Sequence, residues 1–121
     1  MEFMALVYDD PSGWDALSKA EQEAGYEMYL AVAREATAAG ALVDAGRLAP
    51  TAAATSVRVR NGEALVTDGP YAEVKESLGG YYLFSCDSLE EALAWAARIP
   101  SASHGGAVEV RPIHVDEEMV A

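Results

Sequence analysis

The sequence is poor in cysteine, histidine and positive charge, and each shortage excludes a class of function. Cys86 is the one cysteine, so an internal disulfide and a thiolate-based zinc site are excluded. The two histidines lack metal-ligand spacing and give weak support to any other metal centre. Only 8 lysines and arginines stand against 20 acidic residues, and the net charge of −12 would repel nucleic acids and anionic membranes.

Long hydrophobic runs are missing as well. No apolar stretch approaches the roughly 20 residues of a membrane-spanning helix, and the N-terminus lacks the basic region of a secretory signal. With 51% hydrophobic and 23% charged residues, the composition is that of a globular protein. We therefore expect one domain, residues 1–121, in the cytoplasm, with a small molecule or a protein as its partner and with no cofactor.

Short apolar or alternating runs predict the strands. Their ranges are Met4–Tyr8, Ala41–Leu48, Ser56–Arg60, Glu63–Thr67, Tyr81–Cys86 and Ala107–Val115. Asn61 and Gly62 separate the third and fourth runs, and this pair predicts a type I′ turn and a β-hairpin. The stretch Asp68–Gly80 is predicted to be a loop, or a loop with one helical turn.

Two Ser-x-x-Glu capping boxes predict the starts of two helices. The first box begins at Ser18 and precedes a helix over Lys19–Ala39, which Gly40 ends. The second begins at Ser88 and precedes a helix that ends before Pro100.

The resulting order is β-α-β, a hairpin, then β-α-β, which predicts an α+β, ferredoxin-like fold with both helices on one face of an antiparallel sheet. The other face, with Tyr8, Tyr82 or Phe84 among its candidates, is then too apolar to be left in water. Pairing two sheets face to face would bury it, so we expect a homodimer.

The most distinctive segment, Thr67–Tyr82, reads TDGPYAEVKESLGGYY. It resembles the signature of the YCII-related superfamily, in the branch called DGPF after its Asp-Gly-Pro-Phe motif. Tyr71 replaces the phenylalanine of that motif and adds a hydroxyl group. Further segments fit the same branch in the right order: Met4–Tyr8, Gly46–Pro50, Thr55–Arg58 and Gly106–Pro112.

The resemblance implies a ferredoxin-like protomer that forms a dimeric α/β barrel. It implies less about activity, because members of the branch are largely uncharacterised and some are encoded beside, or fused to, extracytoplasmic-function sigma factors. In the wider superfamily a few members resemble small-molecule lyases or dehalogenating enzymes with a His-Asp pair. No histidine lies in the first half of this chain, so that pair has no match here.

Charged residues of the motif are candidates for chemistry. Asp68 or Glu73 is predicted to act as acid or base, and Lys75 or Arg111 to anchor an anionic group. Glu73 and Lys75 are two residues apart, so both project from the same side of an extended segment. The alternative is structural: Asp68 caps a turn, and Glu73 forms a local ion pair with Lys75.

Aromatic and histidine side chains supply the remaining candidates. Tyr8, Tyr71, Tyr81 and Tyr82 can line a substrate pocket, or they can pack the core or a dimer interface. His104, in the loop before the last strand, is either a proton shuttle or a solvated side chain.

Three functions remain open from the sequence. The first is a lyase- or isomerase-type enzyme that converts a small organic molecule, anionic ones included, by cofactor-free acid/base chemistry. The second is a non-catalytic ligand-binding or protein-interaction module linked to sigma-factor regulation. The third is a structural dimer without chemistry of its own.

Overall fold

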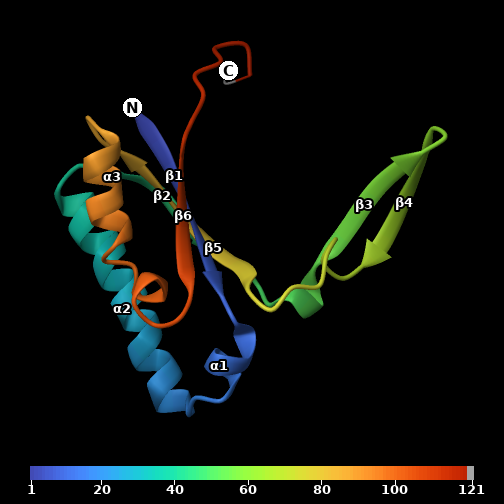
Figure 1. The fold of residues 1–121 in the computed structure, drawn as a ribbon, viewed down its shortest axis with the longest axis horizontal. Coiled ribbons are helices and arrows are strands. Elements are labelled where there is room, and N and C mark those ends of the chain that lie inside the picture. The colour runs from blue at the N-terminus through green and yellow to red at the C-terminus, as the bar shows by residue number, and fades with distance from the viewer. Residues whose placement is uncertain (120–121) are drawn as a thin grey trace.

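The computed structural model describes residues 1–119, which form a four-stranded antiparallel sheet, helices on one face of it and a separate hairpin (Figure 1). The strands are β1 (Glu2–Asp9), β2 (Leu42–Arg47), β3 (Thr55–Arg60), β4 (Glu63–Asp68), β5 (Ser77–Ser85) and β6 (Ala107–Pro112). The helices are α1 (Pro11–Asp15), α2 (Lys19–Ala38) and α3 (Leu89–Ala96), with 3-10 turns at Thr51–Ala53 and Pro100–Ala102. The sheet order β2-β5-β1-β6 is ferredoxin-like, as predicted.

Helix α2 begins at the predicted capping box. The Ser18 hydroxyl accepts a hydrogen bond from the Glu21 amide at 3.1 Å, and the Glu21 carboxylate accepts one from the Ser18 amide at 2.9 Å. The helix ends before Gly40, whose φ of 72° lies in the left-handed region that favours glycine. The second predicted box is only half formed, because Glu91 accepts from the amide of Asp87 instead of that of Ser88.

Alternate residues of β1 and β5 form the core under the helices. Phe3 pairs with Phe84 and Ala5 with Tyr82, and because cross-strand partners share a face, all four lie buried on the helix side. The Phe84 ring stacks between Tyr82 and Trp95, with centroids 5.7 and 6.2 Å apart. The prediction that Tyr82 or Phe84 lies on the uncovered face was therefore wrong.

The uncovered face carries the other residues of the same strands. Met4, Leu6 and Leu83 are partly exposed there, and both long helices lie on the opposite side of the sheet (Figure 1). The Tyr81 ring passes over Gly46, where a Cβ would stand 2.7 Å from the ring, and its hydroxyl donates to the Asp44 carboxylate at 2.9 Å. The face is apolar at its centre and polar at its edges.

The hairpin β3–β4 forms as predicted and projects as an arm from the side of the sheet away from the helices (Figure 1). Asn61 and Gly62 have φ of 53° and 79°, as a type I′ turn requires. We call residues Thr55–Asp68 the arm. No helix among residues 1–119 is long and apolar enough to cross a membrane.

The structure differs most from the prediction at β5, α1 and β6, and several other strand ends shift by one or two residues. Strand β5 begins at Ser77, inside the predicted loop, because its first residues pair with the ends of β1 and β2. Helix α1 was not predicted; Asp10 caps it by accepting a hydrogen bond from the Ser12 amide at 3.0 Å, and Pro11 begins its first turn. Strand β6 ends at Pro112, although the amide of the next residue, Ile113, still donates to the Glu2 carbonyl at 2.8 Å.

Candidate functional site

Three of the predicted ligand-binding residues share the uncovered face of the sheet. Tyr8, Tyr81 and Arg111 come from β1, β5 and β6 respectively. The Arg111 guanidinium forms an ion pair with the Glu109 carboxylate on the same face, and this hydrogen bond is the main reason that its pKa is raised. Arg111 is thus already occupied by a carboxylate, which weakens its assignment as an anion anchor.

The Asp-Gly-Pro-Tyr segment forms the base of the arm. Asp68 is the last residue of β4, opposite Thr55, and the Gly69 amide donates to the Ala54 carbonyl at 2.7 Å. Gly69 has φ of 106°, so the segment needs glycine here. Tyr71 is 80% exposed. It lines a hollow of about 170 Å³ together with Ser56, Arg58, Leu65, Thr67 and Pro70.

The loop after Tyr71 is exposed and returns to the sheet. Neither Glu73 nor Lys75 forms an ion pair among residues 1–119, so the predicted local pair is absent from the part that the structure describes. The pKa of the Asp10 carboxyl is lowered mainly by its hydrogen bonds with Ser12, and Lys75 adds a smaller electrostatic contribution. Lys75 stands two residues before Ser77, which pairs with Asp9, so it lies near the end of β1.

At that end of the sheet the structure gathers three side chains that sequence reasoning did not connect. The Ser101 hydroxyl donates to Asp9 Oδ2 at 2.5 Å and lies 2.6 Å from the Tyr29 hydroxyl. The Tyr29 hydroxyl also reaches Asp9 Oδ2, at 3.3 Å. Ser101 is buried, while Asp9 and Tyr29 are partly exposed. We call these three residues the Asp9 cluster.

Four elements hold the Asp9 cluster in place. Asp9 ends β1, Tyr29 lies in α2, and Ser101 lies in the 3-10 turn that precedes β6. The Tyr82 hydroxyl donates to the Tyr29 carbonyl at 2.8 Å, which ties α2 to β5. A Cβ at Gly106 would stand 2.4 Å from Asp9 Oδ1, so glycine is required for this close approach.

Burial raises the pKa of the Tyr29 phenol, and its contact with Ser101 partly offsets this effect. Tyr29 therefore stays protonated at neutral pH and can donate a hydrogen bond. An ionised Asp9 carboxylate can only accept hydrogen bonds, and its Oδ2 atom already accepts them from two hydroxyl groups. The arrangement places a carboxylate, which can accept a proton, beside a phenol, which can donate a hydrogen bond.

Arg47 and His104 lie at the same end of the sheet as the Asp9 cluster. Arg47 ends β2, and its guanidinium lies 4.8 Å from the Tyr26 ring centre and 5.5 Å from that of Trp14. It forms no ion pair among the described residues. His104 is exposed in the loop between Ser101 and β6, and its amide donates to the Pro100 carbonyl at 3.1 Å.

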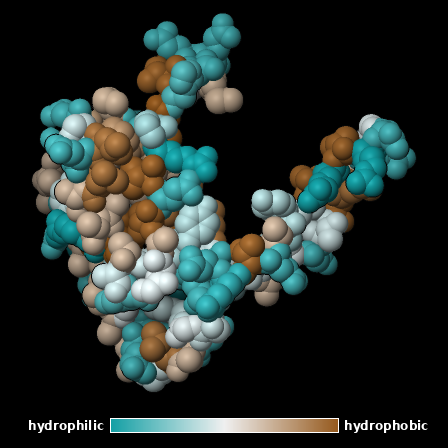
Figure 2. All heavy atoms as spheres, viewed as in Figure 1, coloured by the Kyte–Doolittle hydropathy of each residue, from teal (hydrophilic) through white to brown (hydrophobic). Residues whose placement is uncertain are grey.

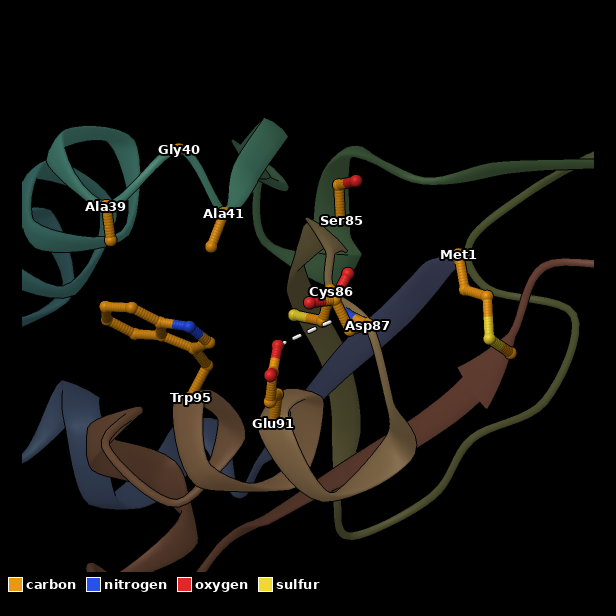
Figure 3. Close-up of a pocket in the computed structure, with 9 residues that line it drawn as sticks. All are labelled: Met1, Ala39, Gly40, Ala41, Ser85, Cys86, Asp87, Glu91 and Trp95. Atoms are coloured by element: carbon orange, nitrogen blue, oxygen red, sulfur yellow. Dashed lines mark hydrogen bonds between the residues drawn. The ribbon is translucent and has the colours of Figure 1, made fainter.

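A wider hollow, of about 480 Å³, lies at the opposite end of the sheet (Figure 3). It is lined by Met1, Ala39, Gly40, Ala41, Ser85, Cys86, Asp87, Glu91 and Trp95. Burial, followed by the charges of Glu91 and Asp87, raises the pKa of the Cys86 thiol, so this cysteine is no activated nucleophile. None of the predicted site residues lines this hollow. No group of three metal-ligating side chains is present within residues 1–119.

The sequence contained only part of the signal for the Asp9 cluster. Asp9 and Tyr29 are 20 residues apart, and Asp9 and Ser101 are 92 apart, so no local motif contains them. The glycine pair before β6 was the available hint, because Gly106 permits the close contact with Asp9.

Comparison with known proteins relates the chain to a protein family, a curated relative and a solved structure. The model of the YCII-related domain family matches residues 1–115. An uncharacterized protein of Rhizobium meliloti (strain 1021) is 44% identical over 114 residues, which are 93% of this chain and 92% of that protein. A solved structure of 5-chloro-2-hydroxyhydroquinone dehydrochlorinase from Burkholderia phenoliruptrix, in complex with 2,5-dihydroxybenzoquinone, aligns over 98% of both chains with a TM-score of 0.57 and 15% identity.

Proposed function

The chain belongs to the YCII-related domain family, and from this premise we propose that it binds and converts a small organic molecule by acid/base chemistry at the Asp9 cluster. The observation that carries the proposal is the cluster itself. A partly exposed carboxylate receives two hydroxyl groups, and one of these, Ser101, is buried. Such a carboxylate is held in one position and can exchange a proton with a bound molecule.

The proposed substrate is a hydroxylated ring compound that carries negative charge. The structural neighbour, which is named a dehydrochlorinase and holds a dihydroxybenzoquinone, supports this class. Arg47 supports it independently, because two aromatic rings hold its guanidinium at the same end of the sheet as Asp9. An unpaired cation held in this way suits an oxyanion or a phenolate.

We assign roles as follows. Asp9 accepts a proton from the substrate, and Tyr29 donates a hydrogen bond to the group that develops negative charge. Lys75 and Arg47 attract the anion, and His104, three residues after Ser101, exchanges protons with solvent. Asp68 and Glu73 precede Lys75 in the chain and are the second candidates for the acid/base role. Tyr8, Tyr71 and Tyr81 are proposed to contact the ring of the substrate.

We also propose that the uncovered sheet face is buried in a homodimer in the cytoplasm. The apolar centre of this face, formed by Met4, Leu6 and Leu83, supports the dimer. The free buried thiol of Cys86 fits a reducing compartment.

Two adjacent carboxylates provide the test of the catalytic proposal. Chloride release from 5-chloro-2-hydroxyhydroquinone and binding of 2,5-dihydroxybenzoquinone are measured for Asp9→Asn and for the matched control Asp10→Asn. We expect Asp9→Asn to lower turnover by about 10²-fold or more, the usual contribution of a positioned base. Asp10→Asn keeps a side-chain oxygen that can cap α1 and removes only the charge, so turnover should stay within about threefold, after correction for folded fraction by thermal melting.

Two other outcomes would change the assignment of the catalytic base or of the function. Turnover that survives Asp9→Asn but is lost in Asp68→Asn or Glu73→Gln places the base in the loop. Ligand binding without turnover in the wild-type protein favours the second candidate function, a ligand-binding or interaction module in sigma-factor regulation. The exposed arm is the observation that favours this second candidate.

A further inference from the structure

We propose that the arm docks through a valine face onto a second copy of this chain, so that each protomer clasps the other. This inference rests on the homodimer proposed above. Val57, Val59 and Val66 are 65%, 71% and 68% exposed, although they are β-branched residues of a regular hairpin. Val57 pairs with Val66, and Val59 pairs with Ala64, so these side chains share one face. We call this set of four residues the valine face.

The opposite face of the arm has a different character. It carries Ser56, Arg58, Arg60, Glu63, Leu65 and Thr67, which pair across the two strands as Ser56–Thr67, Arg58–Leu65 and Arg60–Glu63. The hairpin is therefore amphipathic, and Figure 2 shows hydrophobic residues along it, away from the body of the protein. Apolar and polar side chains that alternate along a strand are typical of a sheet with one face covered and the other exposed to water.

Among residues 1–119, no other segment covers the valine face of the arm. Its hydrogen bonds to other segments lie at its base, where Ser56 donates to the Gly69 carbonyl at 2.8 Å and Gly69 donates to Ala54. A two-stranded hairpin is marginally stable alone in water and needs a third strand or a packed face. The valine face therefore requires contact with another molecule.

The position of the arm identifies a second copy as that molecule. The arm projects from the side of the sheet away from the helices (Figure 1), so a molecule on the uncovered face would lie beside it. Four small apolar side chains are too few for a stable interface, which needs about 800 Å² from each partner. The uncovered face must supply the rest. In a two-fold symmetric dimer, each protomer contributes both its valine face and its uncovered sheet face to the interface.

The charge distribution agrees with this placement. Within the arm, Arg58 and Arg60 balance Glu63 and Asp68, so its net charge is zero and the residues outside it account for the whole charge of −12. Two copies of an acidic protein repel each other. The arm is the segment that a second copy can approach without net repulsion.

Neighbouring residues on opposite faces of β4 give matched variants. Val66→Glu and Thr67→Glu introduce the same charge into the same strand, and each replaces a β-branched residue. The dimer dissociation constant is measured by analytical ultracentrifugation. We expect Val66→Glu to raise it by about tenfold or more and Thr67→Glu to change it by less than about threefold.

Hydrogen exchange of the arm amides supplies a second measurement on the wild-type protein. Docking onto a second copy predicts that exchange in residues 55–68 slows as protein concentration rises through the dissociation constant. A wild-type dimer with concentration-independent arm exchange and equal effects of the two variants would overturn the arm contact and leave sheet pairing intact. A wild-type monomer at about 100 μM would overturn the arm contact and the homodimer together, and would leave the Asp9 proposal standing.

Discussion

At the residue scale, close contacts around Asp9 decide how the end of the sheet is built. Gly106 brings the start of β6 against the Asp9 carboxylate and the Tyr8 carbonyl, and a Cβ there would stand 2.3 Å from that carbonyl. Gly80 likewise lets β5 and β2 approach closely, because a Cβ there would stand 2.7 Å from the Gly46 carbonyl. Backbone approaches of this kind let three strand ends and a buried serine meet at one place.

The Tyr82 phenol links the core to the pH dependence of stability. Burial raises the pKa of Tyr82 from 10.0 to about 12. The folded state therefore holds this proton more tightly than the unfolded state does. Its contribution to stability is complete below pH 10 and is lost as pH rises towards 12. We expect the free energy of unfolding of the wild-type protein to fall over this interval.

Tyr82→Phe tests this expectation by urea unfolding at a series of pH values. The variant loses the hydrogen bond to the Tyr29 carbonyl, so it should be less stable at pH 7 by about 1 kcal/mol. Above pH 10 its stability should fall less steeply than that of the wild type, because one titrating group has gone. Tyr71→Phe, which removes an exposed hydroxyl, is the control and should follow the wild-type curve. Parallel curves for Tyr82→Phe and the wild type would contradict the assignment.

At the element scale, the two long helices differ in how their first turns are capped. The Ser18–Glu21 box of α2 makes both reciprocal hydrogen bonds, whereas at the start of α3 only Ser88 caps, at 3.3 Å from the Glu91 amide. We expect Ser18→Ala to lower the free energy of unfolding by about 1 kcal/mol. Ser88→Ala should have the smaller effect, because its hydrogen bond is longer and not reciprocated. Chemical denaturation of both variants decides this, and the reverse order would contradict it.

The elements that could be predicted from the sequence are those specified by nearby residues. Asn61-Gly62 defines the hairpin turn, and the Ser18 box defines the start of α2, since each signal lies within four residues of the feature. Helix α1 escaped prediction because its Asp-Pro-Ser-Gly start also reads as a turn. The early start of β5 depends on pairing with β1 and β2, which no local pattern contains.

The same limit applies to the candidate site. The sequence singled out Asp68, Glu73 and Lys75 because they stand together in one motif. The structure instead gathers Asp9, Tyr29 and Ser101, which are brought together by the ferredoxin-like topology. Strand alternation likewise could not tell which face of β5 packs under the helices, so Tyr82 and Phe84 were first assigned to the wrong face.

At the scale of the whole molecule, charge and hydrophobic surface are distributed unevenly. The acidic residues give the protein a net charge of −12, yet the arm is neutral and the centre of the uncovered sheet face is apolar. Long-range repulsion between two copies therefore opposes the same association that burial of these surfaces favours. Because salt screens the first effect and leaves the second nearly unchanged, the two can be separated by experiment.

We expect the dimer dissociation constant to fall as NaCl is raised from about 20 mM to about 300 mM, since the Debye length shortens to well below 10 Å. Val66→Glu and Val66→Gln sharpen the measurement, because they differ only in charge. At low salt the glutamate variant should dissociate more readily than the glutamine variant, and the gap should narrow as salt screens the added charge. The part of the defect that both variants keep at high salt reports the lost apolar contact. A dissociation constant that rises with salt in the wild-type protein would instead mean that attractive ion pairs across the interface outweigh the net repulsion.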